Sequence, residues 1–312
     1  MIKRTISKMN PPMIIGMIIV MILLVLCLFG DFIAPRDPYE PITKTEMVDG
    51  TQLLIKPPYP PDGVNLLGTD ILGRDILSRI IVGAKLTMAI VMISVFVKIV
   101  LSLLFGVLAG KGTQFFKSLI MISSTIGSGI PALVLTLMIL RLVFVKYYPI
   151  GQSLLVFGLV IGLVEWGRVG KIVENQVEQI YEMPFMIGDK AVGKSSIRII
   201  FSSVIPHLTT TLLIHTCLEI GRSLLMIAKL GVFEVYVAAA AMDSGMFGNK
   251  GLLGISFEPE YYPEWGALLG NARYAITSQR LWVIISTVIV MSTTILGFNM
   301  LGEGLKRFSW RD

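Results

Sequence analysis

The sequence predicts an all-α, polytopic membrane protein with about six transmembrane helices, each near the roughly twenty residues that cross a hydrocarbon core. Three observations predict this fold class. Of the 312 residues, 54% are hydrophobic and only 15% are charged, whereas soluble domains carry about 25% charged residues. The mean hydropathy is +0.76. The apolar residues also gather in long runs that polar segments separate, which is the pattern of a chain that crosses a membrane repeatedly.

The first predicted span covers residues 13–33. Lys3, Arg4 and Lys8 precede it, as basic residues precede a signal peptide. The apolar run is too long for a signal peptide, however, and it lacks a small-residue cleavage site, so we expect an uncleaved first span. The other spans are predicted at 84–110, 116–145, 153–164, 207–230 and 281–301.

Two of these spans are irregular. Gly127, Gly129 and Pro131 interrupt the third. The fourth is short, and we expect it to extend toward Tyr147.

The distribution of charged residues predicts the orientation of the chain. With the N-terminus inside, the outside loops 34–83 and 231–280 hold 12 of the 21 acidic residues. The inside segments are enriched in Lys and Arg, in agreement with the positive-inside tendency; they are 1–12, 111–115, 166–206 and 302–312. Both termini are therefore predicted to be cytoplasmic. The same asymmetry accounts for the net charge of +6, and since no basic face with interleaved aromatic residues occurs, we expect no nucleic-acid binding.

The first outside loop is rich in proline, with seven prolines at positions 35, 38, 41, 57, 58, 60 and 61. This spacing excludes long helices and favours extended or turn backbone, so only the part from Asp70 onward can be helical. On that amphipathic element the pairs Asp70–Arg74 and Asp75–Arg79 stand at i,i+4 spacing and can form ion pairs.

The most informative stretch is the charged segment 166–206, which lies between two apolar runs. Such a segment cannot lie in hydrocarbon, so it is predicted to be a water-facing loop with structure of its own. Helical spacing over 169–182 is followed by Pro184, a short element over 185–192, Gly193 as a turn, and renewed helical spacing up to Pro206. This order places the short element at the tip of the loop. An ordinary connecting loop is the alternative reading.

The residues at the tip carry a resemblance to a known family. Phe185, the run Gly-Asp-Lys-Ala-Val-Gly over 188–193, and Pro206 thirteen residues further on resemble the EAA loop of ABC-importer permeases. Three further blocks resemble one branch of that family: LLGTDILGRDILSR at 66–79 with Gly83 and Ala84 after it, EWGALL at 264–269 with Arg273, and FNMLGEGLK at 298–306. Together they resemble the C-type permease subunit of dipeptide, oligopeptide and nickel importers, over nearly the whole chain.

The resemblance implies a type I ABC-importer permease fold. Residues 1–83 would form the N-terminal span with its proline-rich outside loop, and 84–306 the core permease domain, whose cytoplasmic coupling loop is 166–206. The short helix of that loop would dock in a cleft of a cytosolic ATPase subunit, and closure of two ATPases would rock the spans between two access states. The residues that the resemblance assigns to this coupling are Phe185, Ile187, Gly188, Asp189, Ala191, Gly193 and Pro206.

The implied partners are a second, similar permease, two ATPase subunits, an extracytoplasmic substrate-binding protein and the lipid bilayer. Short peptides are the implied cargo, with nickel or a metal chelate as the variant. ATP and Mg²⁺ would be held by the partner subunits. The chain itself is expected to hold no cofactor and to be no enzyme, because it contains neither a Walker-type phosphate loop nor a credible catalytic triad.

This sequence departs from the family pattern at one position of interest. Where the family has Glu-Ala-Ala, the chain has Ile187, Gly188 and Asp189. The leading glutamate is therefore missing, and Asp189 is the residue that can replace its charge two positions further on.

The fifth predicted span contains Glu219 and Arg222, which lie three residues apart and therefore on one helix face. A charge at the centre of a span costs about 2.5–3.5 kcal/mol on insertion scales, so a lipid-facing pair is not expected. The pair either lines the translocation path and meets a charged substrate, or fixes the packing against the second permease. Lys98 in the second span is a further buried charge.

The cluster Asp70, Arg74, Asp75 and Arg79 likewise has two interpretations: a docking surface for the external binding protein, or a solvated, self-paired element. No metal site is predicted, because His207 and His215 have no further ligand at suitable spacing, and Cys27 and Cys217 lie within apolar runs. A channel or secondary transporter is the rival class, and a membrane enzyme is a further, less favoured alternative. The rival predicts an intramembrane carboxylate relay or a catalytic cluster, which the sequence does not show.

Overall fold

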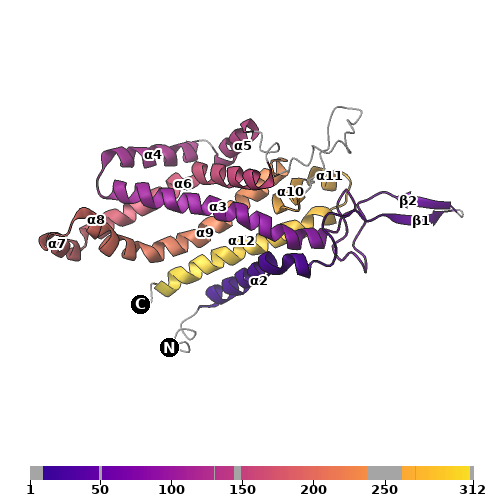
Figure 1. Cartoon of the computed structure of the whole chain (residues 1–312), viewed down its shortest axis with the longest axis horizontal. Helices are drawn as coiled ribbons and strands as arrows, with labels where there is room; N and C mark the ends of the chain where they lie inside the picture. Colours follow the sequence, from indigo (N-terminus) through magenta and orange to yellow (C-terminus); the bar gives the residue numbers. More distant parts are fainter. Residues whose placement is uncertain are drawn as a thin grey trace.

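The computed structural model describes residues 10–48, 51–129, 131–143, 149–237, 262–270 and 272–309. Long helices lie side by side in an elongated bundle (Figure 1). Helix α2 begins, and helix α12 ends, at the end of the bundle that carries α7. The hairpin β1–β2 and the short helices α10 and α11 lie toward the opposite end (Figure 1).

The helices are α2 (Pro11–Ile33), α3 (Ile76–Gly110), α4 (Gln114–Gly129), α5 (Ala132–Leu142), α6 (Ile150–Glu182), α7 (Pro184–Ala191), α8 (Ser196–Ile199), the π-helical turn η2 (Ile200–Val204), α9 (Ile205–Val232), α10 (Trp265–Gly270), α11 (Ala272–Thr277) and α12 (Trp282–Ser309).

Among the described residues, five helical stretches are long and apolar enough to cross a membrane: α2, α3, α6, the continuous stretch Ser196–Val232, and α12. They confirm the helical membrane fold. The span predicted over 116–145 forms two shorter helices, α4 and α5, and the break between them includes Pro131, one of the residues predicted to interrupt it. Neither helix is among the five long stretches. Pro131 is the cause: its ring removes a backbone donor and disfavours helical backbone in the residue before it, and Pro131 itself stands as the extended cap of α5.

Two predicted boundaries also move. Helix α3 begins at Ile76 instead of residue 84, because the Asp75 side chain caps it by accepting a hydrogen bond of 2.8 Å from the backbone N–H of Ser78. Helix α6 runs without a break from Ile150 to Glu182, so the fourth span and its predicted cytoplasmic extension are one helix.

The proline-rich segment between α2 and α3 holds an antiparallel hairpin that the sequence pattern did not predict, formed by β1 (Lys44–Val48) and β2 (Thr51–Ile55). The hairpin projects beyond the ends of the helices (Figure 1). Its base is fixed by Tyr59, whose hydroxyl donates to the carbonyl of Ile55 at 2.9 Å and accepts from the backbone N–H of Lys44 at 3.1 Å. Lys44 also pairs with Asp62, and this hydrogen bond lowers the pKa of Asp62 to about 2.

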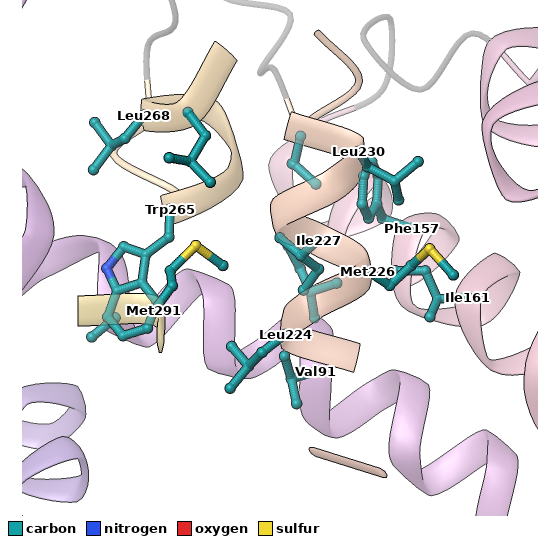
Figure 2. Close-up of a cluster of buried hydrophobic side chains, with 14 of the residues drawn as sticks. Val91, Phe157, Ile161, Leu224, Met226, Ile227, Leu230, Trp265, Leu268 and Met291 are labelled. Carbon is teal, nitrogen blue, oxygen red and sulfur yellow. The ribbon is translucent and has the colours of Figure 1, made fainter. Parts of the chain in front are cut away.

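The core of the bundle lies where α3, α6, α9, α10 and α12 meet. Leu224, Ile227 and Leu230 of α9 lie among buried side chains of the other helices (Figure 2). Trp265 of α10 is fully buried there, and its indole N–H donates to the carbonyl of Ile80 at 2.8 Å. This core fixes α9, whose first residues adjoin α7 and η2.

Small residues bring α3 and α6 into close contact. A Cβ atom added at Gly162 would lie 2.7 Å from the Cβ of Val97, and one added at Gly110 would lie 2.5 Å from the Cβ of Val177. Glycines of this kind allow membrane helices to approach closely. The tight packing holds the polar side chains at the middle of both helices in fixed positions.

Candidate functional site

Two sites on this scaffold gather polar or exposed groups: the loop tip around α7, and a charge cluster at the centre of the bundle. At the tip, α6 ends at Glu182 and Pro184 begins α7. Met186 is the inward anchor of α7; it is fully buried among apolar side chains of the loop and of the ends of α6 and α9. The ring of Phe185 stacks on the ring of His207 in α9, with centroids 4.9 Å apart and planes 15° apart. The short helix α7 is therefore packed against the N-terminal end of α9.

Asp189 provides a polar attachment for the same helix. Its carboxylate accepts a hydrogen bond of 2.5 Å from the hydroxyl of Ser203 in η2, and it pairs with Lys194. The Lys194 contact first, and the Ser203 contact second, lower the pKa of Asp189. Because the pKa is lowered, the contribution of this carboxylate to the stability of the fold is present above its ordinary pKa. It is lost only as the pH falls through the lowered value. At physiological pH, Asp189 is thus ionised and links α7 to η2, directly before α9.

Gly193 forms the turn after α7, as predicted. Its φ is +77°, in the left-handed region that glycine adopts without penalty. The N–H of Gly193 donates to the carbonyl of Lys190, and the N–H of Lys194 donates to that of Asp189, which is the hydrogen-bond pattern of a Schellman C-cap. The chain reverses direction here and enters α8.

Pro206 lies just after the π-helical turn η2. A proline has no N–H to donate and its ring crowds the carbonyl four residues earlier, so the backbone widens before it. Instead, the N–H of Ile205 bonds to the carbonyl of Ile200, five residues back. Ser203, which donates to Asp189, lies within this π-helical turn.

The outward face of the loop tip is apolar. Ile187 is 72% exposed, and Gly188 and Ala191 are exposed beside it on α7. Val192, Ile197 and Phe201 are also large apolar side chains that are mostly exposed. We call these six residues the tip surface. An apolar surface next to charged residues, at one end of a membrane protein, is typical of a protein interaction site.

The second site is a cluster of charged side chains near the middle of α3, α6 and α9. Glu219 of α9 is fully buried, and its carboxylate accepts hydrogen bonds of 2.9 Å from both Arg168 and Arg222. Lys98 of α3 is also fully buried and lies 3.5 Å from Glu219. It pairs with Glu165 of α6 and donates to the hydroxyl of Ser223 at 3.0 Å.

The predicted pairing of Glu219 with Arg222 and the predicted burial of Lys98 are confirmed. Glu165 and Arg168 were missed, since Arg168 was assigned to the water-facing loop that begins at residue 166. It instead lies near the middle of α6. The sequence signal that could have found them is their i,i+3 spacing at the end of an apolar run.

The cluster is open on one side. A hollow on the surface is lined by Glu165, Arg168, Arg222, Leu225, Met226 and Lys229. The side chains of Arg168 and Arg222 are 40% and 47% exposed, whereas that of Glu219 is not exposed at all. The two guanidinium groups therefore form part of the wall of the hollow, and the carboxylate of Glu219 lies buried behind them.

The prediction of one exposed amphipathic element at Asp70, Arg74, Asp75 and Arg79 is wrong, because all four side chains are buried. Asp70 pairs with Arg74 at 2.8 Å and also with Arg79 at 3.4 Å. Asp75 also caps α3, which the sequence pattern did not predict. These groups fix the segment before α3 to the start of that helix. Their docking role stays a prediction, which their burial disfavours.

Of the remaining residues, Cys27 and Cys217 are free. In the ranges that the structure describes, no three His, Cys, Asp or Glu side chains gather as metal ligands would. The side chain of Arg273 lies outside the described residues.

Comparison with known proteins gives two family matches. Residues 102–233 match the model of the binding-protein-dependent transport system inner membrane component, and residues 8–58 match the N-terminal TM domain of oligopeptide transport permease C. The first range includes the loop tip and every residue of the charge cluster except Lys98.

Individual relatives agree with these matches. The chain is 28% identical to the di/tripeptide transport system permease protein DppC of Pseudomonas aeruginosa, over 94% of this chain and 86% of the relative. It is 25% identical to the dipeptide transport system permease protein DppC of Alkalihalophilus pseudofirmus, over 96% and 85%. It is 21% identical to the oligopeptide transport system permease protein OppC of Bacillus subtilis, also over 96% and 85%.

Proposed function

Because the chain belongs to the family of binding-protein-dependent transport system inner membrane components, we propose that it forms half of the translocation pathway of an ATP-driven importer of di- and oligopeptides. The observation that carries the coupling role is the tip surface on and beside α7, which is apolar and exposed, while Met186 anchors α7 to the bundle. Nickel, the alternative cargo predicted from the sequence, finds no support in the names of these relatives.

The partners in this proposal are a second, similar permease, two cytosolic ATPase subunits that hold ATP and Mg²⁺, and an extracytoplasmic substrate-binding protein. The tip surface would fill a cleft of one ATPase, with Ile187 as its anchor, since buried apolar anchors dominate the energy of most interfaces. The start of α2 and the end of α12 lie at the same end of the bundle as α7, which supports placing both termini in the cytoplasm (Figure 1).

The contacts of α7 suggest how a movement of the ATPase would reach the membrane. Phe185 stacks on α9, Asp189 bonds to η2, and Met186 packs among residues of α6 and α9. A rigid displacement of α7 would therefore move α6 and α9 together. These two helices carry Arg168, Glu219 and Arg222, so the charge cluster lies on the elements that the ATPases would move.

The proposed assembly can be tested by purification from the native membrane through a tag on this chain. We expect two ATPase subunits and a second permease to co-purify, with ATP hydrolysis that the binding protein and a peptide stimulate. Recovery of the chain without ATPases, from a membrane in which it transports peptide, would contradict the proposal.

Replacing Gly193 is expected to weaken ATPase attachment. At φ +77° a side chain adds strain of about 1–2 kcal/mol, so Gly193→Val should distort the turn that positions α7. We expect less ATPase to co-purify and a slower peptide uptake. Gly151→Val is the control, because an added Cβ there, as at position 193, meets nothing within 4 Å, while the backbone is helical and the residue lies at the start of α6, away from the loop tip. Wild-type uptake by the Gly193→Val complex would show that this turn has no role in coupling.

Replacing Asp189 is expected to impair coupling more than docking. Asp189→Ala removes the contacts with Ser203 and Lys194 but leaves the exposed tip surface in place. We therefore expect the ATPases to co-purify, with several-fold less peptide transported per ATP hydrolysed. Glu182→Ala, at an exposed carboxylate at the end of α6, is the matched control. An unchanged ratio of transport to hydrolysis in the Asp189 variant would exclude this link from the coupling route.

A further inference from the structure

We propose that Arg168, Arg222 and Lys229 form a subsite that binds the carboxylate of the transported peptide as it passes through the bundle. The proposal rests on the function proposed above and names the chemical group that the hollow recognises. All three side chains line the same hollow, and they come from two helices, α6 and α9.

The charges of the site favour an anionic ligand. Three cations, Lys98, Arg168 and Arg222, share two carboxylates, those of Glu165 and Glu219. Lys229 adds a fourth cation to the wall of the hollow, and none of the ion pairs among the described side chains includes it. The hollow therefore carries an excess of positive charge in a helix bundle, where such a charge is costly unless an anion balances it.

The arrangement of the arginines leaves donors for a ligand. Each guanidinium group has five N–H donors, and Arg168 and Arg222 each use one terminal nitrogen on the carboxylate of Glu219. Both side chains remain about half exposed to the hollow. Glu219 holds the two groups from behind, so a second carboxylate can approach from the open side and accept hydrogen bonds from them.

The geometry of α9 extends the subsite along the bundle. Arg222 and Lys229 lie seven residues apart and thus on one face of the helix, about 10 Å apart along its axis. Met226, which also lines the hollow, lies between them. The carboxylate of the peptide can therefore pass from one cation to the other along the same helix face. Leu225 and Met226 form an apolar part of the wall, which can contact uncharged side chains of the peptide.

The peptide C-terminus is the carboxylate that every cargo of such an importer has, whatever its side chains. A site for that group would bind di- and oligopeptides alike, without recognising the side chains of the cargo. The competing occupant of the hollow is a carboxylate of the second permease, and the two occupants predict different experimental results.

The test uses the complete complex in proteoliposomes with its binding protein. Uptake of a labelled tripeptide is compared with uptake of the same tripeptide amidated at its C-terminus, each at a concentration that saturates the binding protein. We expect the wild type to transport the free acid faster than the amide. Arg222→Gln and Arg168→Gln should each slow the free acid about tenfold, the effect of one charge-assisted hydrogen bond, and change amide uptake less than twofold.

Lys171→Gln is the matched control, because Lys171 is a cation of α6 that pairs with Glu174 and does not line the hollow. It should leave the ratio of acid to amide uptake unchanged, and Arg222→Lys should keep most of the preference. An equal loss for both peptides, or a second permease that no longer co-purifies with the arginine variants, would overturn the proposal in favour of a structural pair with the partner. Failure of the wild type to transport either peptide would instead refute the proposed function.

Discussion

The variant Glu219→Gln is expected to lose the stably folded permease. Its fully buried carboxylate accepts hydrogen bonds from Arg168 and Arg222 and lies 3.5 Å from Lys98. An amide has the same shape but no charge, so three cations would lose their shared counter-charge. Removing one partner from a buried ion pair costs about 3–5 kcal/mol. Thermal unfolding of the purified chain in detergent should show a strongly lowered melting temperature and a low yield.

A matched exposed pair separates this effect from a general loss of charge. Glu303 pairs with Arg307 at 3.1 Å, with both side chains about half exposed, and pairs of this kind contribute about 0–1 kcal/mol. Glu303→Gln should therefore unfold like the wild type. Adding Arg222→Met to Glu219→Gln removes a cation whose carboxylate partner is Glu219 and should restore part of the stability. A melting temperature of Glu219→Gln equal to that of the wild type would show that Glu219 does not hold the cluster together.

The variant Ile187→Asp is expected to separate the ATPases from the permease. Ile187 is 72% exposed on the outward face of α7, so a carboxylate there can stay in water and should not disturb the fold. In a docked complex the same carboxylate would be buried without a partner. The loss of a central apolar anchor costs at least about 2 kcal/mol, or roughly 30-fold in affinity, before that penalty is added. Binding of the purified ATPase to permease in nanodiscs measures this directly.

The control for this variant lies at the other end of the molecule. Leu53 in the hairpin is also a large, mostly exposed apolar residue, and Leu53→Asp should leave ATPase affinity unchanged. If Ile187→Asp binds the ATPase as tightly as Leu53→Asp does, α7 is not the docking element.

The membrane fold could be predicted because it depends on composition and on run length. Each span other than the third was recognised from a predominantly apolar stretch of sequence. The third is divided at Pro131, one of the residues predicted to interrupt it. The hairpin could not be predicted from its surroundings, because the prolines around it indicate only that the backbone is not helical. Its register depends on pairing between Lys44–Val48 and Thr51–Ile55, which no short-range pattern reveals.

The loop tip was predicted closely, since Pro184, Gly193 and Pro206 set its turns through local backbone preferences. The charge cluster was predicted only in part. Glu219 and Arg222 share a helix and their spacing shows that they can pair, but the contacts with Lys98 and Arg168 join three helices. Contacts of this kind depend on how the helices pack. The sequence predicted that the charge of Asp189 replaces that of the missing glutamate. In the structure, the Asp189 carboxylate contacts Ser203 and Lys194 within the same loop.

The most direct test of the account is peptide uptake by proteoliposomes that contain the complex built around this chain. We expect accumulation of a labelled dipeptide only when ATP and Mg²⁺ are present on the side of α7 and the binding protein is present on the opposite side. Ile187→Asp in this chain should abolish that accumulation while the chain still folds. Uptake by the chain alone without ATP, or ATP-driven uptake that Ile187→Asp leaves unchanged, would contradict the account.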